Sequence, residues 1–394
     1  MAVPYRCIAD LVKRPIPEDS FFNRAFRIRC FEPACTVPPR LAAKYGLAPD
    51  NVQQVVSITD ATTLDVCWWN PVRSSKPQNF TAAAAAAPAD PTGGGGAERC
   101  DFCAWPELTA ADPVGRIEGP HAVSCSNLFK YIGPYHGVIL WKHLHDPLSF
   151  DADQLADMLA VAGGWFDAAA AHAVGAGEAV SQLRPLLVWN CGARAGASFH
   201  HGHCQTMVAS AVDFPTLARA ERQRLAYEAQ GQGDSDEGGQ GLGPRDVYGD
   251  VLRAHREVGL SRELAAGYGA SAAAYCSVCP TKDAEVVVHG EALTCPAFQR
   301  LVYAALRALI DELGVQSFNA TVSNIRLGGG APAGRARGGL PVVARLVSRG
   351  RPAAVSSDFG GLEVFGGATI GHTDPWVVAA ALDRALATLA AGGS

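Results

Sequence analysis

Hydrophobic residues recur along the chain with two different periods. Short and nearly uninterrupted apolar runs at 136–141 and 185–190 predict buried strands, and 198–209 predicts a third strand. The apolar positions of 151–174 instead follow the spacing of an amphipathic helix. This part of the chain is therefore expected to run strand, helix, strand, strand.

The C-terminal part repeats that order. Residues 285–288 and 317–322 have the pattern of strands, and 296–313 between them has the pattern of a helix. A last helix is expected to begin at Asp374 and Pro375, because proline fits the first helical position. Two blocks with the same order predict a duplicated α+β fold.

Three segments lack the large apolar side chains that could offset the entropy of ordering, and we expect them to be surface loops. They are 81–98, rich in Ala, Pro and Gly, 228–244, rich in Gly and acidic residues, and 328–339, rich in Gly and Arg. Using these segments as borders, we expect an N-terminal segment (1–99), a first α+β half (100–215), a flexible linker (216–259) and a second half (260–394).

Composition narrows the class of protein. The chain has 394 residues, 18% of them charged, and a net charge of -5, which argues against nucleic acid or an anionic membrane as partner. Phosphate binding must then depend on a few placed cations. Twelve cysteines are too few for a disulfide scaffold in a chain of this length, so they are expected to be thiols or metal ligands in a reducing compartment. Without an apolar span or a leader pattern, we expect a cytoplasmic protein, with an organelle address left open.

The most informative stretch is the predicted strand at 198–209. Alternate residues of a strand share one face, so His201, His203 and Gln205 should project together at a spacing of about 6–7 Å, with Gly202 leaving room for a ligand. A surface strand with outward polar residues would explain one histidine but not this trio. Neutral imidazole is a good nucleophile toward phosphorus near pH 7, and Gln205 and Ser198 could hydrogen-bond phosphate oxygens.

This stretch resembles the galactose-1-phosphate uridylyltransferase branch of the histidine-triad superfamily. Gly202 stands where that family has proline in its His-Pro-His-x-Gln motif. The resemblance implies a duplicated histidine-triad-like fold with antiparallel sheets and flanking helices. It also implies that His203 becomes nucleotidylated and that Gln205 binds the phosphate and favours transfer over hydrolysis. The matching residues are Asn190, Gly192, Gly196, Ser198, His201, His203 and Gln205.

A metal site is indicated upstream. Cys100 and Cys103 form a CxxC pair that could supply two thiolates to Zn²⁺, or could be ordinary buried thiols. By resemblance to the transferases, His145 and His201 would complete a structural zinc site, with His143 as a competitor of His145. A second CxxC pair, at 276–279, has no histidine pair nearby and is interpreted as structural or incidental.

The resemblance also implies residues that bind substrate. Arg73 and Lys76 lie in a segment similar to the family's phosphate-binding Pro-x-Arg-x-x-Arg-Pro, and Asn127 matches a segment that touches base and ribose. Asn190 and Gly196 belong to the glycine-rich approach. Toward the C-terminus only Glu363 and Gly361 remain of the family's Lys-Phe-x-x-Gly-Tyr-Glu segment. The lysine for a sugar phosphate is missing, and Arg345 or Arg349 is expected to substitute for it.

These features predict a nucleotidylyltransferase with a ping-pong mechanism through His203. Its donor would be a nucleotide sugar of the UDP-hexose type and its acceptor a hexose 1-phosphate. A phosphorylase that uses inorganic phosphate, with an ADP-sugar, a GDP-sugar or diadenosine tetraphosphate as donor, is the main alternative. A hydrolase and a non-catalytic zinc-binding module are the others. The resemblance also implies a homodimer. His136, His121 and His372 are interpreted as isolated core or surface imidazoles.

Overall fold

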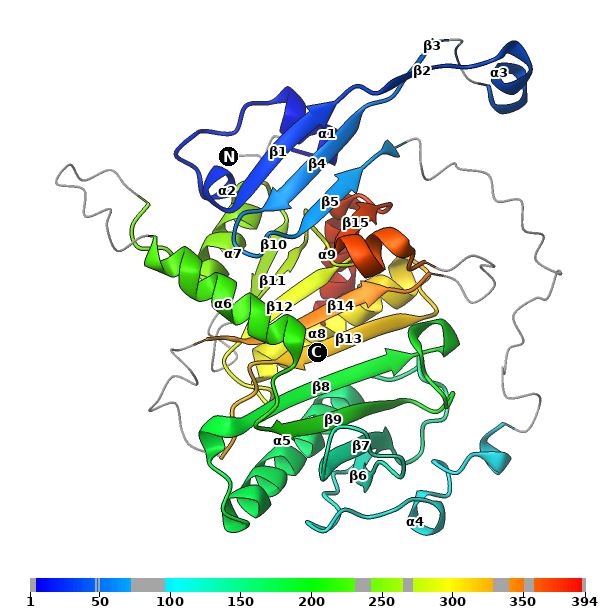
Figure 1. Ribbon diagram of the computed structural model, residues 1–394. Helices are drawn as coiled ribbons and strands as arrows, with labels where there is room; N and C mark the ends of the chain where they lie inside the picture. The colour runs from blue at the N-terminus through cyan, green and yellow to red at the C-terminus, as the bar shows by residue number, and fades with distance from the viewer. Residues whose placement is uncertain are drawn as a thin grey trace.

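A nine-stranded antiparallel sheet forms the centre of the computed structural model, which describes residues 5–46, 48, 50–71, 96–230, 242–264, 272–328, 340–350 and 358–391. Its strands lie in the order β10-β11-β12-β14-β13-β8-β9-β7-β6 (Figure 1). They are β6 (Ala122–Ser126), β7 (Tyr135–Trp141), β8 (Leu183–Cys191), β9 (His203–Ser210), β10 (Ser261–Leu264), β11 (Ala272–Cys276), β12 (Val286–Gly290), β13 (Phe318–Ser323) and β14 (Val342–Ser348).

Two four-stranded units make up most of this sheet. In chain order the first is β6, β7, helix α5, β8 and β9, and the second is β11, β12, helix α8, β13 and β14. Their spatial orders, β8-β9-β7-β6 and β13-β14-β12-β11, are the same. The units meet where β8 pairs antiparallel with β13, with Asn190 opposite Asn319. The predicted duplicated α+β fold is thereby confirmed.

Helices cover one face of each unit. α5 (Ala152–Gly175) packs on β6, β7 and β9, and α8 (Pro296–Arg307) packs on β11, β12 and β14, with α9 (Pro375–Ala391) against α8. α5 begins at a capping box in which Asp151 and Gln154 bond each other's backbone N–H groups. The opposite face of the sheet is free of these helices, and both units present the same side there.

A smaller sheet lies beside the second unit. Its order is β1-β4-β5-β15, and the first three strands come from the N-terminal segment while β15 comes from the C-terminal region (Figure 1). Trp69 donates a hydrogen bond from Nε1 to the carbonyl of Val278 across the two sheets at 3.0 Å. The N-terminal segment is therefore built into the second half. The strands are β1 (Phe26–Phe31), β4 (Val55–Asp60), β5 (Val66–Trp69) and β15 (Ala368–Gly371).

Short elements complete the N-terminal region. α2 packs against α7, and a two-stranded ribbon of β2 and β3 extends from the small sheet. Most of the segment 81–98 lies outside the described residues. The elements are α1 (Ile8–Lys13), α2 (Phe21–Ala25), β2 (Ala34–Thr36), α3 (Pro39–Tyr45), β3 (Asp50–Val52) and α4 (Trp105–Leu108).

The prediction of a flexible linker at 216–259 is wrong for most of its length. The structure has α6 (Pro215–Ala229) and α7 (Val247–Glu257) there, with 231–241 outside the described residues. α7 is amphipathic and buries Val251, Ala254 and His255 against the core. The Gly-rich and acidic composition is confined to 228–244 and does not describe most of the flanking residues, which form α6 and α7. α6 crosses the open face of the second unit (Figure 1).

The other strands and helices predicted from the apolar pattern are found where expected. The start of β9 is the one clear difference. β9 begins at His203, and 198–202 forms bends in place of the predicted strand. Among the described residues, no helix is long and apolar enough to cross a membrane.

Candidate active site and metal site

His203 lies at the start of β9 on the open face of the first unit. Its Nδ1 is 2.7 Å from the carbonyl oxygen of His201, and since a carbonyl can only accept, the proton of the neutral ring is on Nδ1. Nε2 then carries the lone pair and makes no hydrogen bond within the described chain. The side chain is nearly buried and Phe102 contacts its ring edge-on at 5.2 Å. Burial lowers the pKa of His203, so the neutral, nucleophilic form dominates near pH 7.

Gln205 lies two residues further along the same face, and other side chains hold its carbonyl oxygen. The Tyr131 hydroxyl donates to Oε1 at 3.3 Å, and His136 Nε2 lies 2.9 Å from the same oxygen. His136 is fully buried, and Asn127 Nδ2 is 3.1 Å from its Nε2. With its oxygen engaged, the amide NH₂ of Gln205 is the group left to donate to a substrate.

The interpretation of His136 as an isolated imidazole is therefore wrong. It belongs to the core, as expected, but it contacts Gln205 across the β7·β9 pair, where Val138 lies opposite Gln205. The register of two strands separated by about sixty residues decides this contact, and no local pattern in the sequence carries that register. Asn127 reaches the site through the same histidine.

The predicted metal ligands come together. One ligand atom from each of Cys100, Cys103, His145 and His201 lies within 4.8 Å of the others. The Cys103 Sγ is 3.3 Å from His201 Nδ1 and 3.4 Å from His145 Nδ1, and Cys100 Sγ is 3.6 Å from His201 Nδ1. Ligands of a tetrahedral zinc with ordinary bond lengths are separated by about 3.3–3.8 Å. These four residues could hold a metal ion.

Hydrogen bonds and pKa values among these four residues also support a metal site. His201 Nε2 lies 2.7 Å from the carbonyl of Trp141, which leaves Nδ1 unprotonated and aimed at the cysteines. Burial lowers the pKa of His201 to about 4, so the ring is a neutral ligand. Burial and the neighbouring Cys100 raise the pKa of Cys103 to about 11, a cost that a divalent cation would remove. His143 is exposed and does not belong to the cluster, whereas His145 does.

Gly202 does not leave room for a ligand, contrary to the prediction. A Cβ on this residue would lie 2.2 Å from the Trp141 ring, so glycine is needed for packing under that ring. The tight packing explains why 198–202 bends before the strand begins. The bend places the His201 ring next to the cysteines and the His201 carbonyl next to His203 Nδ1. Both contacts therefore depend on it.

The glycine-rich approach forms a short turn next to Asn190. Gly192 and Gly196 have φ of 82° and 89°, conformations that favour glycine. Asn319 of the second unit donates from Nδ2 to Asn190 Oδ1 at 2.7 Å and to the Ala195 carbonyl at 2.9 Å. Ser198 follows the turn and is exposed. The turn is therefore held by the junction between the two units.

The remaining predicted residues have other partners or lie outside the described part of the chain. Arg73 and Lys76 lie outside the described residues. Glu363 contacts Lys282 at 3.9 Å and accepts a hydrogen bond from the Gly360 N–H. Of the two arginines expected to replace the family's lysine, Arg349 is paired with Asp358 at 2.7 Å, and Arg345 is paired with the buried Glu285 at 2.7 Å.

Comparisons with solved structures identify the fold. No protein-family model and no curated protein matches the chain. An ADP-glucose phosphorylase from Arabidopsis thaliana with bound ADP-glucose is 14% identical, with a TM-score of 0.55 over 83% of this chain and 97% of that one. A GalT-like protein from Arabidopsis thaliana is also 14% identical, with a TM-score of 0.54 over 83% and 98%.

A uridylyltransferase structure is 14% identical, with a TM-score of 0.51 over 84% of this chain and 98% of that one. At this level of identity the likeness establishes the fold alone. The chain has the fold of these phosphorylase, GalT-like and uridylyltransferase structures. The fold expected from the His201–Gln205 motif is therefore confirmed.

Proposed function

We propose that the protein is a nucleotidylyltransferase that forms a covalent nucleotidyl intermediate on His203. The observation that carries this proposal is the 2.7 Å contact between His203 Nδ1 and the His201 carbonyl, which leaves Nε2 as the free nucleophile. Nε2 would attack the α-phosphorus of a nucleotide sugar, form a P–N bond and release the sugar phosphate as the P–O bond breaks. The carbonyl then stabilises the positive charge that develops on the imidazole ring.

The second half-reaction reverses the first with another acceptor. A phosphate oxygen of the acceptor attacks the phosphorus, the P–N bond breaks, and His203 returns to its neutral form. Gln205, whose oxygen is held by Tyr131 and His136, would donate its NH₂ to a nonbridging oxygen in both transition states. Ser198, the Gly196 turn, Arg73 and Lys76 are proposed to hold the remaining phosphate oxygens, with Asn127 and Glu363 as further substrate contacts.

Inorganic phosphate is a second candidate for the acceptor, in place of a hexose 1-phosphate. Arg345 and Arg349, the cations expected to bind a hexose phosphate, are both neutralised by carboxylates in the structure. An ADP-glucose phosphorylase is also among the proteins that share this fold. Both acceptors present a phosphate anion, so the paired arginines do not distinguish them, and the shared fold is the observation that makes inorganic phosphate a second candidate.

We further propose that the metal is zinc with a structural role. The two thiolates and two imidazoles are the donor set that zinc prefers, and the ion would fix His201 and thereby the carbonyl that orients His203. We expect about one equivalent of zinc in the purified protein and less than half of it in Cys100→Ser, measured by atomic absorption. Unchanged zinc in that variant would exclude Cys100 as a ligand.

The covalent step is tested by labelling. Protein incubated with α-³²P-labelled UDP-glucose, ADP-glucose or GDP-hexose should retain acid-labile, base-stable label with one of them. His203→Ala should lose the label, whereas His121→Ala, at an exposed histidine, should keep it. Release of the label by hexose 1-phosphate or by inorganic phosphate then separates the two acceptors. No label with any donor, or full labelling of His203→Ala, would overturn the proposal in favour of a non-catalytic module.

A further inference from the structure

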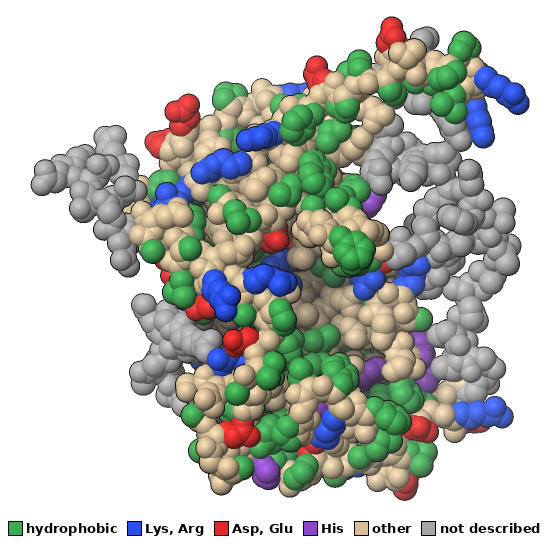
Figure 2. Space-filling model, viewed as in Figure 1, with side chains coloured by type: hydrophobic (Ala, Val, Ile, Leu, Met, Phe, Trp, Pro, Cys, Tyr) green, Lys and Arg blue, Asp and Glu red, His purple; other side chains and the backbone are tan. Residues whose placement is uncertain are grey.

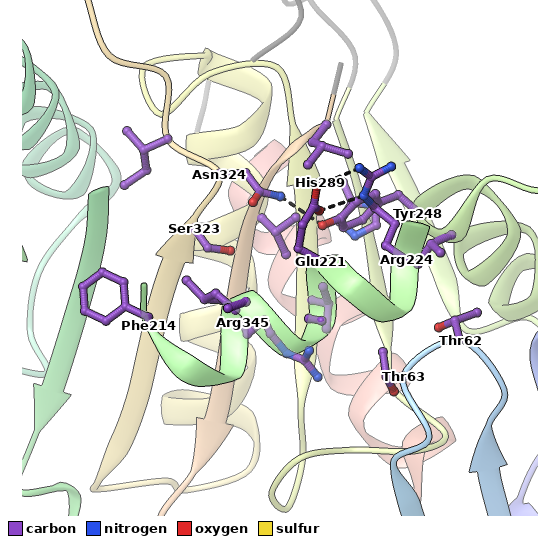
Figure 3. A pocket seen from close by; sticks show the side chains of 18 of the residues that line it. Thr62, Thr63, Phe214, Glu221, Arg224, Tyr248, His289, Ser323, Asn324 and Arg345 are labelled. Carbon is purple, nitrogen blue, oxygen red and sulfur yellow. Dashed lines mark hydrogen bonds and ion pairs between the residues drawn. The ribbon is translucent and has the colours of Figure 1, made fainter. Parts of the chain in front are cut away.

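The open face of the second unit contains a cavity of about 880 Å³ (Figure 3). Its floor is formed by β12, β13 and β14 together with the start of β8 from the first unit, and its roof by α6 and α7. The turn between β4 and β5 closes one end. Neither His203, Gln205 nor the cysteine and histidine cluster lines it. The cavity has the size of sites for small organic ligands, which span about 300–1,000 Å³.

The lining combines apolar walls with a few polar groups that point inward. Phe214 and Leu217 of α6 face the strands, and Val343 lies on the floor. Figure 3 shows Tyr248, Asn324, Ser323 and Arg345 converging beneath α6, and Asn324 donates from Nδ2 to the Tyr248 hydroxyl at 3.1 Å. Apolar walls with a small number of placed polar groups are typical of a site for an organic ligand.

His289 supplies an unmet hydrogen-bonding group. The residue is 8% exposed, and its ring lies edge-on to Tyr248 and Tyr275, at 5.5 Å from each. It makes no hydrogen bond to any residue that the structure describes. Burial, and then the charge of Arg345, lower its pKa to about 3, so the ring is neutral. A buried imidazole without a partner is unfavourable, and a ligand hydroxyl or carbonyl would satisfy it.

The charges of the lining leave an excess of arginine. Arg224 is paired with Glu221, and Arg345 with Glu285. Arg222 and Arg326 have no ion pair in the described parts of the chain, and Arg326 Nε is buried without a hydrogen-bond partner. Figure 2 shows basic side chains on the face that α6 crosses, beside a hollow. Guanidinium groups bind phosphate in bidentate geometry, so this excess favours a phosphorylated ligand.

Besides Glu221, three carboxylates line the cavity. Asp213 is paired with Arg184, a further lining arginine, and Asp60 and Asp65 are hydrogen-bonded to threonines near them in sequence. Asp60 Oδ1 accepts hydrogen bonds from the Thr62 and Thr63 N–H groups, and Asp65 accepts one from the Thr63 hydroxyl at 2.7 Å. Burial raises the pKa of Asp60. Among the described residues, neither Asp60 nor Asp65 forms an ion pair with Arg222 or Arg326.

We propose that this cavity is a second ligand site, which binds a phosphorylated metabolite of the size of a nucleotide or sugar phosphate. Its phosphate would bind Arg222 and Arg326, and the polar groups of its ring would bind His289 and Tyr248. The two units would then use the same face for different purposes, chemistry in the first and ligand binding in the second. The site is independent of the covalent step at His203.

The test uses two residues of α6 that line the cavity, Arg222 and Leu217. The full chain is titrated by calorimetry with AMP, UMP, glucose 1-phosphate and inorganic phosphate. Arg222→Met removes a lining cation, Leu217→Trp fills the cavity, and Arg219→Met, an exposed arginine of the same helix outside the lining, is the matched control. At least one organic phosphate should bind Arg222→Met and Leu217→Trp at least tenfold more weakly than the control.

Labelling of His203 in the same variants separates this proposal from the proposed function. Label incorporation should be unchanged in Leu217→Trp while binding is lost. The organic probe that responds distinguishes a nucleotide from a sugar phosphate. Equal affinity of all three variants, binding of inorganic phosphate alone, or no binding of any probe to the unmodified protein would overturn the second site whether or not His203 is labelled.

Discussion

The two units of the sheet have the same strand order but differ in the side chains on their open faces. In the first, β9 presents His203 and Gln205, and His136 on β7 contacts the glutamine. In the second, β14 presents Val343 and Arg345, and Arg345 is paired with Glu285, directly before β12. The backbone scaffold is duplicated, whereas the chemistry is not.

The difference lies in which polar groups are left unsatisfied. Glu285 is fully buried and accepts from the Thr281 N–H, the Thr281 hydroxyl and Arg345, so its bonds are closed within the protein. His203 and Gln205 each contact the protein through one end of the side chain, and the other end has no hydrogen bond to the described chain. The comparison indicates that a polar pair on this face contributes either to stability or to reaction, according to how completely it is bonded.

The largest expected effect comes from removing Glu285 from its ion pair with Arg345. Glu285→Ala removes the buried acceptor of Arg345 and of the Thr281 N–H and hydroxyl, and should lower the free energy of unfolding by about 3 kcal/mol. Gln205→Ala should change it by less than about 1 kcal/mol, because the glutamine is half-buried and its partner Tyr131 is exposed and can bond to water. Urea unfolding followed by circular dichroism measures both. Replacing the pair together, Glu285→Leu with Arg345→Met, should restore most of the loss. Equal destabilisation by both alanine variants would contradict the comparison.

Fold and site were not equally predictable from the sequence. The duplicated order of strands and helices follows from local periodicity. The CxxC pair is visible in the sequence, and the resemblance to the transferases added His145 and His201 to it. Contacts that depend on the register of paired strands, such as that between His136 and Gln205, could not be predicted from the sequence. Gly202 was interpreted as space for a ligand because the sequence does not show that the Trp141 ring lies above it.

The region around α6 shows a second limit. The low-complexity segment lies between α6 and α7. A composition averaged over the segment and the two helices does not indicate the helices. The cavity below α6 is lined by residues from β4, α6, α7, β12 and β13, which are distant in sequence, so no motif could indicate it. What sequence patterns carry is local, whereas cavities and relayed contacts depend on how distant elements pack.

A smaller effect is expected from pH and concerns His255, a buried histidine of α7 that lines the cavity. Its Nδ1 lies 2.8 Å from the Val251 carbonyl, and its Nε2 accepts from the Val278 N–H. Burial lowers its pKa to about 4. The folded state therefore binds its proton less readily than the unfolded state, so this contribution is complete above pH 6.5 and is lost as pH falls from 6.5 to about 4.

The full contribution is about 3 kcal/mol, of which about 2 kcal/mol is lost by pH 5. Unfolding free energies at pH 7.5 and pH 5 should therefore differ less in His255→Asn than in the unmodified protein. His121→Asn is the control, because His121 is exposed. If the free energy of unfolding changed equally with pH in His255→Asn and in the unmodified protein, His255 would not be held neutral in the folded state.

The smallest expected effect tests the link between His136 and Gln205. His136→Phe keeps a ring in the core but removes the Nε2 contact with Gln205, so the amide should lose its orientation toward the phosphate. The rate of label transfer to His203 should fall by about 10–100-fold, the cost of a misplaced catalytic group. If His136 acts through Gln205, adding Gln205→Ala to His136→Phe should slow transfer little further, although each change alone slows it. Multiplying effects would instead mean that the histidine only supports the core, and the first unit would then resemble the second in using its buried polar side chains for stability.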